Sequence, residues 1–201
     1  YENSSYGKTL SAIFIEEFKK AGGTIVGQEV IEKGGRDFRS QLTRIGATRA
    51  PLIVAYAYYA EAGLLVRQAS ELGIKAQFMS HGSVQNKAFG EIAGPAANGF
   101  ISGSPRWDEN APNVQAFIER YRKRWNREPD LYGPYFYDAV KMYAAAIEKG
   151  GDTPAGILTA LKGLKDFPGI NGVMNFGPDN VVLLPLRFVK FENGNWVPIK
   201  R

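Results

Sequence analysis

The stretch PLIVAYAYYAEAGLLVRQASELG, residues 51–73, decides the fold class of this chain. It begins with a short apolar run at residues 52–54, which predicts a strand buried on both faces. Apolar residues then recur at helical spacing up to a glycine that is typical of a helix end. The apolar residues are Leu65, Ala69 and Leu72, and the glycine is Gly73. A strand followed at once by a helix is the repeating unit of a parallel α/β sheet.

Tyrosines gather at the C-terminal end of this predicted strand, at Tyr56, Tyr58 and Tyr59. In an open parallel sheet, ligands bind in the crevice outside the carboxyl ends of the strands. A tyrosine there can contact a ligand, and it can equally cap the edge of the core, because its ring is apolar and its hydroxyl tolerates water. Position alone leaves both roles open.

The sequence around this stretch continues the alternation of helices and strands. We expect helices at residues 9–21 and 84–92, and a third helix that begins after Asp37 as its capping residue. Strands are expected at residues 24–30, 77–79 and 99–102. This pattern predicts an α/β fold with a parallel sheet flanked by helices. The series opens on a helix, so a strand is expected to precede Tyr1.

From Ser104 onward the pattern changes to helices. Three are predicted, at residues 114–125, 132–147 and 154–164, without strands of their own. The second is apolar on nearly all sides, which predicts burial by several neighbours. A hairpin is expected at residues 182–199, with Asn193-Gly194 as its two-residue turn. Residues 102–112 and 164–172 are the best crossover candidates between two lobes.

Composition excludes several classes of function. The 201 residues contain no cysteine and one histidine, His81, so disulfides, thiolate metal sites and transition-metal centres are not expected. No apolar run reaches the roughly 18 residues that a membrane helix needs. The net charge of +5 permits acidic partners without demanding them. The chain starts at Tyr1 without a signal-type segment, so we expect a processed or truncated start.

Motifs for catalysis are absent or incomplete. Gly7-Lys8-Thr9 resembles the end of a phosphate-binding loop, but Glu2 stands where its leading glycine should be. There is no nucleophile elbow and no dinucleotide fingerprint. His81 could act as a base, although a structural or exposed role is more common for a lone histidine. No catalytic residue, metal or cofactor is therefore expected.

The basic run at residues 120–127 is the only feature that invites a nucleic-acid interpretation. Its aromatic residues, Tyr121 and Trp125, fall on the apolar stripe of the predicted helix and should face inward. A solvated helix face is therefore the better account, and we expect no nucleic-acid partner.

Several short motifs carry a resemblance to a known family, in its order and at its spacing. They are Ser4-Ser5-Tyr6-Gly7, Asp37-Phe38, Tyr58-Tyr59-Ala60-Glu61, Arg67-Gln68-Ala69 with Gly73, Gln77-Phe78-Met79, Gly133-Pro134-Tyr135 and Tyr137-Asp138-Ala139-Val140. With them, essentially the whole chain resembles the periplasmic solute-binding proteins of leucine/isoleucine/valine type, which serve branched-chain amino acid ABC importers.

This resemblance implies a type I periplasmic-binding-protein-like fold, with one lobe nearly complete and the other partial. Residues 1–103 would form most of the second lobe, residues 104–165 helices of the first lobe, and residues 166–201 a return segment and C-terminal hairpin. The family's lobes close on a small ligand without chemical turnover, outside the cytoplasm, and deliver it to a membrane permease. A ligand-sensing regulatory domain of the same fold is the alternative, and an enzyme is a third, less favoured interpretation.

The resemblance also points to ligand-binding residues. Aromatic positions that line the family's cleft match Tyr6, Tyr58 and Tyr135. In the amino-acid binders a carboxylate that holds the ligand ammonium follows the Gln-Phe-Met strand; here that position is Gly82, flanked by His81 and Ser83. Because an unpaired buried ammonium is costly, a small carboxylate, an aromatic acid or an amide fits at least as well as an amino acid.

A final expectation concerns assembly. If residues 113–125 and 132–147 are helices of a partial lobe, they should expose a large apolar surface. Such surfaces drive association. We therefore expect a dimer or a tightly bound complementing fragment.

Overall fold

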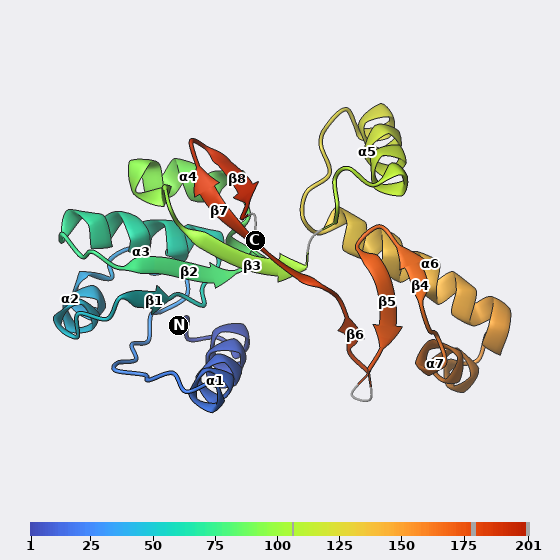
Figure 1. The fold of residues 1–201 in the computed structure, drawn as a ribbon, viewed down its shortest axis with the longest axis horizontal. Coiled ribbons are helices and arrows are strands. Elements are labelled where there is room, and N and C mark those ends of the chain that lie inside the picture. Colours follow the sequence, from blue (N-terminus) through green and yellow to red (C-terminus); the bar gives the residue numbers. More distant parts are fainter. Residues whose placement is uncertain (106, 178–179, 200–201) are drawn as a thin grey trace. The chain divides into compact units, whose positions relative to one another are not determined.

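The computed structural model describes residues 1–105, 107–177 and 180–199. The chain divides into two units, the first made of Tyr1–Ser104 with Phe188–Arg201 and the second of Pro105–Arg187 (Figure 1). We expected residues 166–201 to form a return segment and the C-terminal hairpin. Residues 166–187 of that segment lie instead in the second unit. Among the residues described, no helix is long and apolar enough to cross a membrane.

The first unit is built on a five-stranded sheet of order β1-β2-β3-β7-β8. The strands are β1 (Leu52–Val54), β2 (Gln77–His81), β3 (Ile101–Pro105), β7 (Leu186–Glu192) and β8 (Asn195–Pro198). β1, β2 and β3 are parallel, with Val54 opposite Met79 and Met79 opposite Ile101. The prediction of an α/β fold with a parallel sheet is thus confirmed, with an antiparallel hairpin added at one edge.

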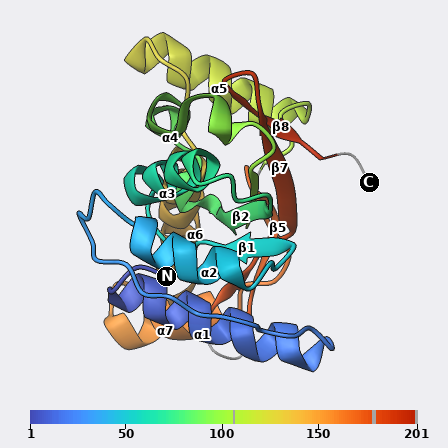
Figure 2. The same ribbon diagram turned by 90° about the vertical axis from the view of Figure 1, so that its left-hand side faces the viewer.

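Helices connect and cover these strands. They are α1 (Ser5–Lys20), α2 (Arg39–Ala47), α3 (Tyr59–Glu71) and α4 (Lys87–Ala93), with short 3-10 turns η1 (Gly82–Val84) and η2 (Gly94–Ala97). α1 lies beside the β1 edge of the sheet in both ribbon views (Figure 1 and Figure 2). Asp37 precedes the N-cap of α2, Phe38, and its carboxylate accepts a hydrogen bond from the Arg39 amide at 3.1 Å.

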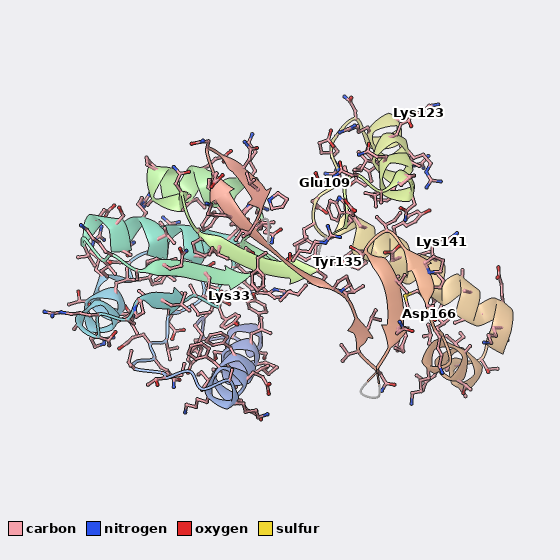
Figure 3. All side chains as sticks on the ribbon, in the orientation of Figure 1. Lys33, Glu109, Lys123, Tyr135, Lys141 and Asp166 are labelled. Atoms are coloured by element: carbon pink, nitrogen blue, oxygen red, sulfur yellow. The ribbon has the colours of Figure 1, made fainter. Side chains whose placement is uncertain are left out.

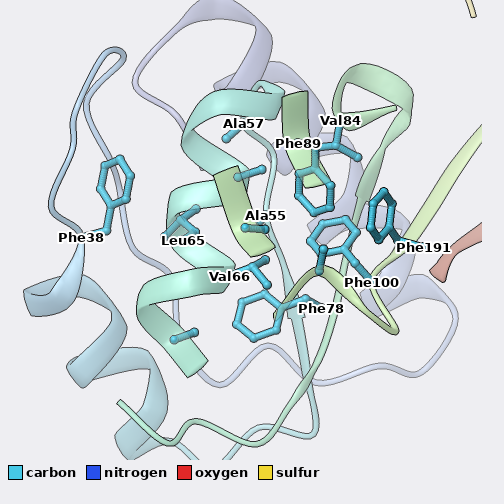
Figure 4. Packing of buried hydrophobic residues seen from close by; sticks show 14 of the residues in the cluster. Phe38, Ala55, Ala57, Leu65, Val66, Phe78, Val84, Phe89, Phe100 and Phe191 are labelled. Carbon is cyan, nitrogen blue, oxygen red and sulfur yellow. The ribbon is translucent and has the colours of Figure 1, made fainter. Parts of the chain in front are cut away.

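The core of the first unit is aromatic where the hairpin meets the parallel strands. Phe89 of α4 packs edge-on against Phe100 at 4.8 Å and against Phe191 of β7 at 5.7 Å between ring centroids (Figure 4). The predicted turn at Asn193-Gly194 joins β7 to β8, and both residues have positive φ, 48° and 86°, as such two-residue hairpins require. The hairpin therefore closes this side of the core.

Two expectations about the opposite edge are wrong. Residues 24–30 form no strand, and the neighbouring Ile31 makes a β-bridge to Glu2. The β1 strand is half-buried along its whole length instead of buried on both faces. The reason is the same in both cases, because no strand among the described residues pairs with this edge of β1 or with residues 24–30.

The second unit combines three helices with a small sheet. The helices are α5 (Pro112–Trp125), α6 (Gly133–Gly150) and α7 (Pro154–Lys162). β4 (Phe167–Gly169), β5 (Gly172–Phe176) and β6 (Val182–Leu183) form a three-stranded sheet of order β4-β5-β6, with antiparallel pairing. The expectation that these helices come without strands is therefore wrong, because the strands follow them in sequence.

Asp138 joins α6 to this small sheet. Its buried carboxylate accepts hydrogen bonds from the Ile170 amide at 2.8 Å, and from the Asn171 amide and side chain at 2.9 and 2.7 Å. Gly169 lies so close that a Cβ there would approach Asp138 Oδ2 to 2.6 Å. These contacts hold the β4–β5 turn on the helix.

One face of α6 stays open. Phe136 is 72% exposed and Val140 is 68% exposed, and Tyr143 and Ile147 continue the stripe. The prediction that this helix is covered on several sides is therefore wrong for this chain. α7 packs on α6, whose Met142 and Ala146 are buried, and Phe117 of α5 packs against Tyr137 of α6 at 5.1 Å between ring centroids. None of the described elements of this unit covers the stripe.

Candidate ligand-binding site

The candidate site lies at the carboxyl ends of β1 and β2 in the first unit. Tyr58 follows β1 and is the N-cap of α3, while His81 ends β2 and leads into η1, which contains Gly82 and Ser83. Tyr6 comes from the first turn of α1. The parallel pairing of β1 with β2 places these strand ends at one edge of the sheet, where ligands of such sheets bind.

The start of α1 is positioned by its cap and by a close backbone approach. The Ser4 hydroxyl accepts a hydrogen bond from the Gly7 amide at 3.1 Å, which is the usual N-cap bond. A Cβ at Gly7 would come within 2.2 Å of the Glu2 carbonyl oxygen, so only glycine lets the helix lie this close to the chain before it. This contact fixes where Tyr6 leaves the helix.

Three of the predicted residues are in direct contact. The rings of Tyr6 and Tyr58 stack with centroids 4.8 Å apart and an interplanar angle of 24°. The Tyr6 hydroxyl lies 2.6 Å from Ser83 Oγ, and Ser83 Oγ donates to the Ala57 carbonyl at 3.1 Å. Because the single Ser83 proton is used for Ala57, the Tyr6 hydroxyl is the donor to Ser83. We call this group, Tyr6, Tyr58 and Ser83, the tyrosine cluster.

The tyrosine cluster presents one ring to the surface. Tyr58 is 39% exposed, whereas Ser83 and Gly82 are buried beneath it. The Lys33 ammonium lies over the Tyr58 ring at 5.6 Å from its centroid, a cation–π contact (Lys33 is labelled in Figure 3). The cluster therefore combines an accessible aromatic face with a positive charge. Lys33 was not predicted from the sequence, because nothing in its local pattern distinguishes it from other surface lysines.

His81 adds a titratable group at the same strand ends. Its side chain is exposed to solvent at the end of β2. The pKa of the imidazole is lowered from its ordinary value because surrounding protein atoms remove part of its hydration. The neutral form is thereby favoured near neutral pH.

A row of polar groups that sequence reasoning missed continues from His81 to β3. The Gln85 side-chain amide donates to Ser102 Oγ and Ser104 Oγ, each at 2.9 Å, and the Ser102 hydroxyl donates to the His81 carbonyl at 3.1 Å. Both serines are buried. The Ser-Gly-Ser sequence at the end of the predicted strand was the available signal, since small hydroxyl residues at strand ends often line ligand crevices.

Two acids of the first unit are withdrawn from the surface. Glu2 is 0% exposed, and Glu61 is buried and accepts a hydrogen bond from the Gly34 amide at 2.9 Å. Gly82 brings no charge. Within the part of the chain that the structure describes, no group of three or more His, Cys, Asp or Glu side chains could hold a metal ion.

Tyr135 lies in the second unit, at the start of α6 (Figure 3). Its hydroxyl donates to the Pro105 carbonyl, and its ring lies 6.4 Å from that of Tyr132. The structure thus brings together the predicted residues of the first unit and assigns Tyr135 to the other unit.

Comparison with known proteins decides the family. A family model described as periplasmic binding protein matches residues 1–195. The chain belongs to the periplasmic binding protein family. The resemblance read from the short motifs is thereby confirmed.

Curated members of this family resemble the chain over most of its length. A leucine-, isoleucine-, valine-, threonine- and alanine-binding protein of Pseudomonas aeruginosa is 28% identical over 164 residues, which are 81% of this chain and 44% of that protein. The Leu/Ile/Val-binding protein homolog 1 of Brucella suis is 26% identical over 196 residues, 96% of this chain and 53% of that protein. The chain spans about half the length of these relatives.

Solved structures of the family share the fold. A leucine binding protein, LivK, of Thermotoga maritima aligns with a TM-score of 0.87 at 24% identity, over 98% of this chain and 57% of that one. LivJ of Streptococcus pneumoniae, in complex with isoleucine, aligns with a TM-score of 0.80 at 27% identity over the same shares. A solute binding protein of Rhodopseudomonas palustris in complex with benzoate aligns with a TM-score of 0.82 at 17% identity, over 98% and 56%.

Proposed function

We propose that this chain is part of the solute receptor of an ABC importer, and that it binds a small amino acid or carboxylate without chemical turnover. The observation that carries the proposal is the tyrosine cluster at the carboxyl ends of β1 and β2, where an accessible ring and a hydroxyl network meet. Family membership supports a binding role. The partners would be the ligand and a membrane permease, and the location periplasmic or extracellular.

The proposal assigns the two units to the two lobes of such a receptor. Residues 1–103 would be most of one lobe and residues 104–165 helices of the other. The small sheet that follows these helices lies in the second unit, and the C-terminal hairpin returns to the first. In the first unit the ligand would touch Tyr6, Tyr58 and the 81–83 segment, and Tyr135 stays a candidate in the second. Tyrosine suits these positions because its ring stacks on an apolar ligand body and its hydroxyl hydrogen-bonds a polar end.

We further propose that the ligand carries a carboxylate and need not carry an ammonium. Gly82 stands where an acid would pair with an ammonium, and Glu2 and Glu61 are buried. An ammonium left unpaired in a closed site costs roughly several kcal/mol. The Lys33 ammonium beside the Tyr58 ring favours an anion, as does His81 once its imidazole is protonated. Similar proteins have been solved with isoleucine and with benzoate, so both ligand classes occur on this fold.

The apolar stripe on α6 supports a proposal about assembly. Phe136, Val140, Tyr143 and Ile147 expose enough apolar side chain on one helix face to drive association of the chain with a second copy. Analytical ultracentrifugation of the chain should show a dimer that Val140→Asp dissociates. A monomer at every concentration tested would refute the proposal.

Tyr58 provides the direct test of the ligand site. A panel of amino acids, aliphatic carboxylates and aromatic carboxylates is screened by thermal stabilisation on the complete receptor polypeptide, and the best ligand is titrated by calorimetry. Tyr58→Ala should weaken its binding by about 1–3 kcal/mol, because stacking area and a ring contact are lost. Tyr143→Ala, which removes an exposed tyrosine from α6, is the matched control and should leave the affinity unchanged. Equal affinity in wild type and Tyr58→Ala would remove Tyr58 from the site.

A further inference from the structure

The loop of residues 32–37 brings a positive charge to the tyrosine cluster. The ammonium of Lys33 lies 5.6 Å from the centroid of the Tyr58 ring (Lys33 is labelled in Figure 3). The lysine is exposed to solvent, and it forms no ion pair with any residue that the structure describes. Its charge is therefore available to an anion that reaches the exposed part of the Tyr58 ring.

Two buried side chains of α3 hold this loop in place. Glu61 Oε1 accepts a hydrogen bond at 2.9 Å from the amide of Gly34, the residue directly after Lys33. About two turns further along the helix, the side-chain oxygen of Gln68 accepts a hydrogen bond at 2.7 Å from the Phe38 amide. Both side chains are buried. Because a buried group that loses its hydrogen-bond partner is costly, these bonds fix the backbone that carries Lys33.

The same helix also positions the ring. Tyr58 is the N-cap residue of α3, and Glu61 lies in the first turn that follows it. The acid beside Lys33, Glu32, accepts hydrogen bonds from the Asn3 side chain at 3.0 and 3.2 Å, so it is engaged away from the lysine. One helix turn thus sets both the ring and the loop in place before any ligand arrives, and such preorganisation favours binding.

We propose that Lys33 selects the carboxylate of the ligand, and that Glu61 is a positioning residue that acts on Lys33 through the Gly34 amide. The inference rests on the proposed function, because it concerns the same site. The Tyr58 ring would contact the apolar body of the ligand, and the ammonium would donate to its carboxylate in a charge-assisted hydrogen bond. A neutral amide of the same shape would keep the ring contact and lose the charge.

Matched pairs of probes test the role of Lys33. Benzoate with benzamide, and isovalerate with isovaleramide, are titrated by calorimetry into the complete receptor polypeptide. Lys33→Gln should weaken binding of the carboxylates about five- to tenfold and that of the amides less than about twofold. Lys75→Gln is the control, because Lys75 is an exposed lysine just before β2, at the opposite end of the sheet, and it should change neither.

Tyr58→Ala, measured with the same probes, distinguishes this inference from the proposed function. It should weaken binding of carboxylates and amides alike, because the ring contacts the part that they share. If it does so while Lys33→Gln leaves the carboxylate preference unchanged, the role of Lys33 is overturned and the ligand site stands. If neither variant changes any affinity, the site itself is refuted. A wild type that binds neither carboxylate more tightly than its amide overturns the inference as well.

Two variants of Glu61 test the positioning role. Glu61→Gln keeps an acceptor oxygen for the Gly34 amide and should keep the carboxylate preference within about twofold of wild type. Glu61→Leu removes the acceptor, so it should lower the carboxylate preference about as much as Lys33→Gln while amide binding persists. Loss of carboxylate and amide binding in equal measure would show a general structural defect and overturn the positioning role.

Hydrogen exchange in the wild type tests the same role without a variant that has to fold. The Gly34 amide, bonded to Glu61, should exchange about tenfold or more slowly than the Lys33 amide, which has no hydrogen-bond partner among the described residues. Equal exchange at the two amides would overturn the positioning role, whatever the stability of Glu61→Leu.

Discussion

The first unit has two open places of different character, the tyrosine cluster and an apolar groove along the edge of β1. Phe14, Phe18, Leu42 and Phe78 are among the residues that line this groove, which we call the β1 groove. In the cluster, the hydroxyls of Tyr6 and Ser83 are paired with one another and with the backbone, and an aromatic face is left for a ligand. In the groove, the walls are apolar, and the backbone of β1 along this edge has no neighbouring strand. The hydroxyls of the tyrosine cluster are thus paired, and its Tyr58 ring is exposed to solvent. The β1 groove is open along an unpaired strand edge.

This difference explains why the β1 groove, a cavity of about 450 Å³, is not the better ligand site. A small-molecule site needs a few polar groups at fixed positions within an apolar surround, and the cluster supplies these at the strand ends where such sheets bind ligands. The β1 edge beside the groove instead offers a repeating row of backbone groups, which suits a peptide strand better than a small carboxylate.

We expect the largest effect on the free energy of unfolding, where a substitution in the closed core is compared with one in the wall of the β1 groove. Phe89 is fully buried among Phe100, Phe191 and Trp196, so Phe89→Ala should lower the free energy of unfolding by about 3–5 kcal/mol. Phe18 lines the groove and is only partly buried, so Phe18→Ala should cost about 1–2 kcal/mol, in keeping with its smaller buried area.

Urea unfolding followed by circular dichroism measures both variants. If Phe18→Ala destabilised the chain as much as Phe89→Ala, the groove wall would be part of a closed core, and the contrast between the two places would fail.

The smallest expected effect is the pH dependence of ligand binding at the cluster. The pKa of His81 lies below its ordinary value of about 6.5, so the imidazole is mostly neutral at pH 7. If it faces a carboxylate, binding should tighten as pH falls through that lowered pKa, because the protonated ring is the form that attracts an anion. The gain should be less than about fivefold, since the side chain is exposed to solvent.

Calorimetric titrations at several pH values from about 7.5 down to about 5 measure this dependence. This range extends roughly one unit or more to either side of the ordinary histidine pKa. His81→Gln is the control and should give a flat profile. A profile that stays equally steep in His81→Gln would assign the effect to another group, and a flat profile in the wild type would leave His81 without a role in binding.

The sequence predicted the elements that carry strong local signals. The strand–helix repeat of residues 51–73 and the turn at Asn193-Gly194 follow from apolar periodicity and from turn chemistry, and both are confirmed. The strands β4 and β5 were missed because they are short, and because Pro168, Gly169 and Gly172 weaken any strand pattern. The predicted hairpin begins too early, because its first two residues pair with β5 as β6 and β7 starts at Leu186. Residues 24–30 have the pattern of a strand, but a strand needs a partner, which local sequence does not report.

The candidate site was predictable only in part. Tyr58 and His81 lie at strand ends that the pattern locates, and Tyr6 entered through the family resemblance. The stacking of Tyr6 on Tyr58 joins segments far apart in sequence, so spacing could not predict it. The same holds for Gln85, whose bonds to Ser102 and Ser104 depend on how η1 meets β3.

A small carboxylate should bind at the tyrosine cluster and not in the β1 groove. We would record ¹H–¹⁵N NMR spectra of this chain during titration with the carboxylate selected by the ligand panel. The Tyr58 and Ser83 amide signals should shift while those of Gly27 and Val54 stay in place. The opposite pattern, with shifts at Gly27 and Val54 and none at Tyr58 and Ser83, would place the ligand in the groove and refute this site.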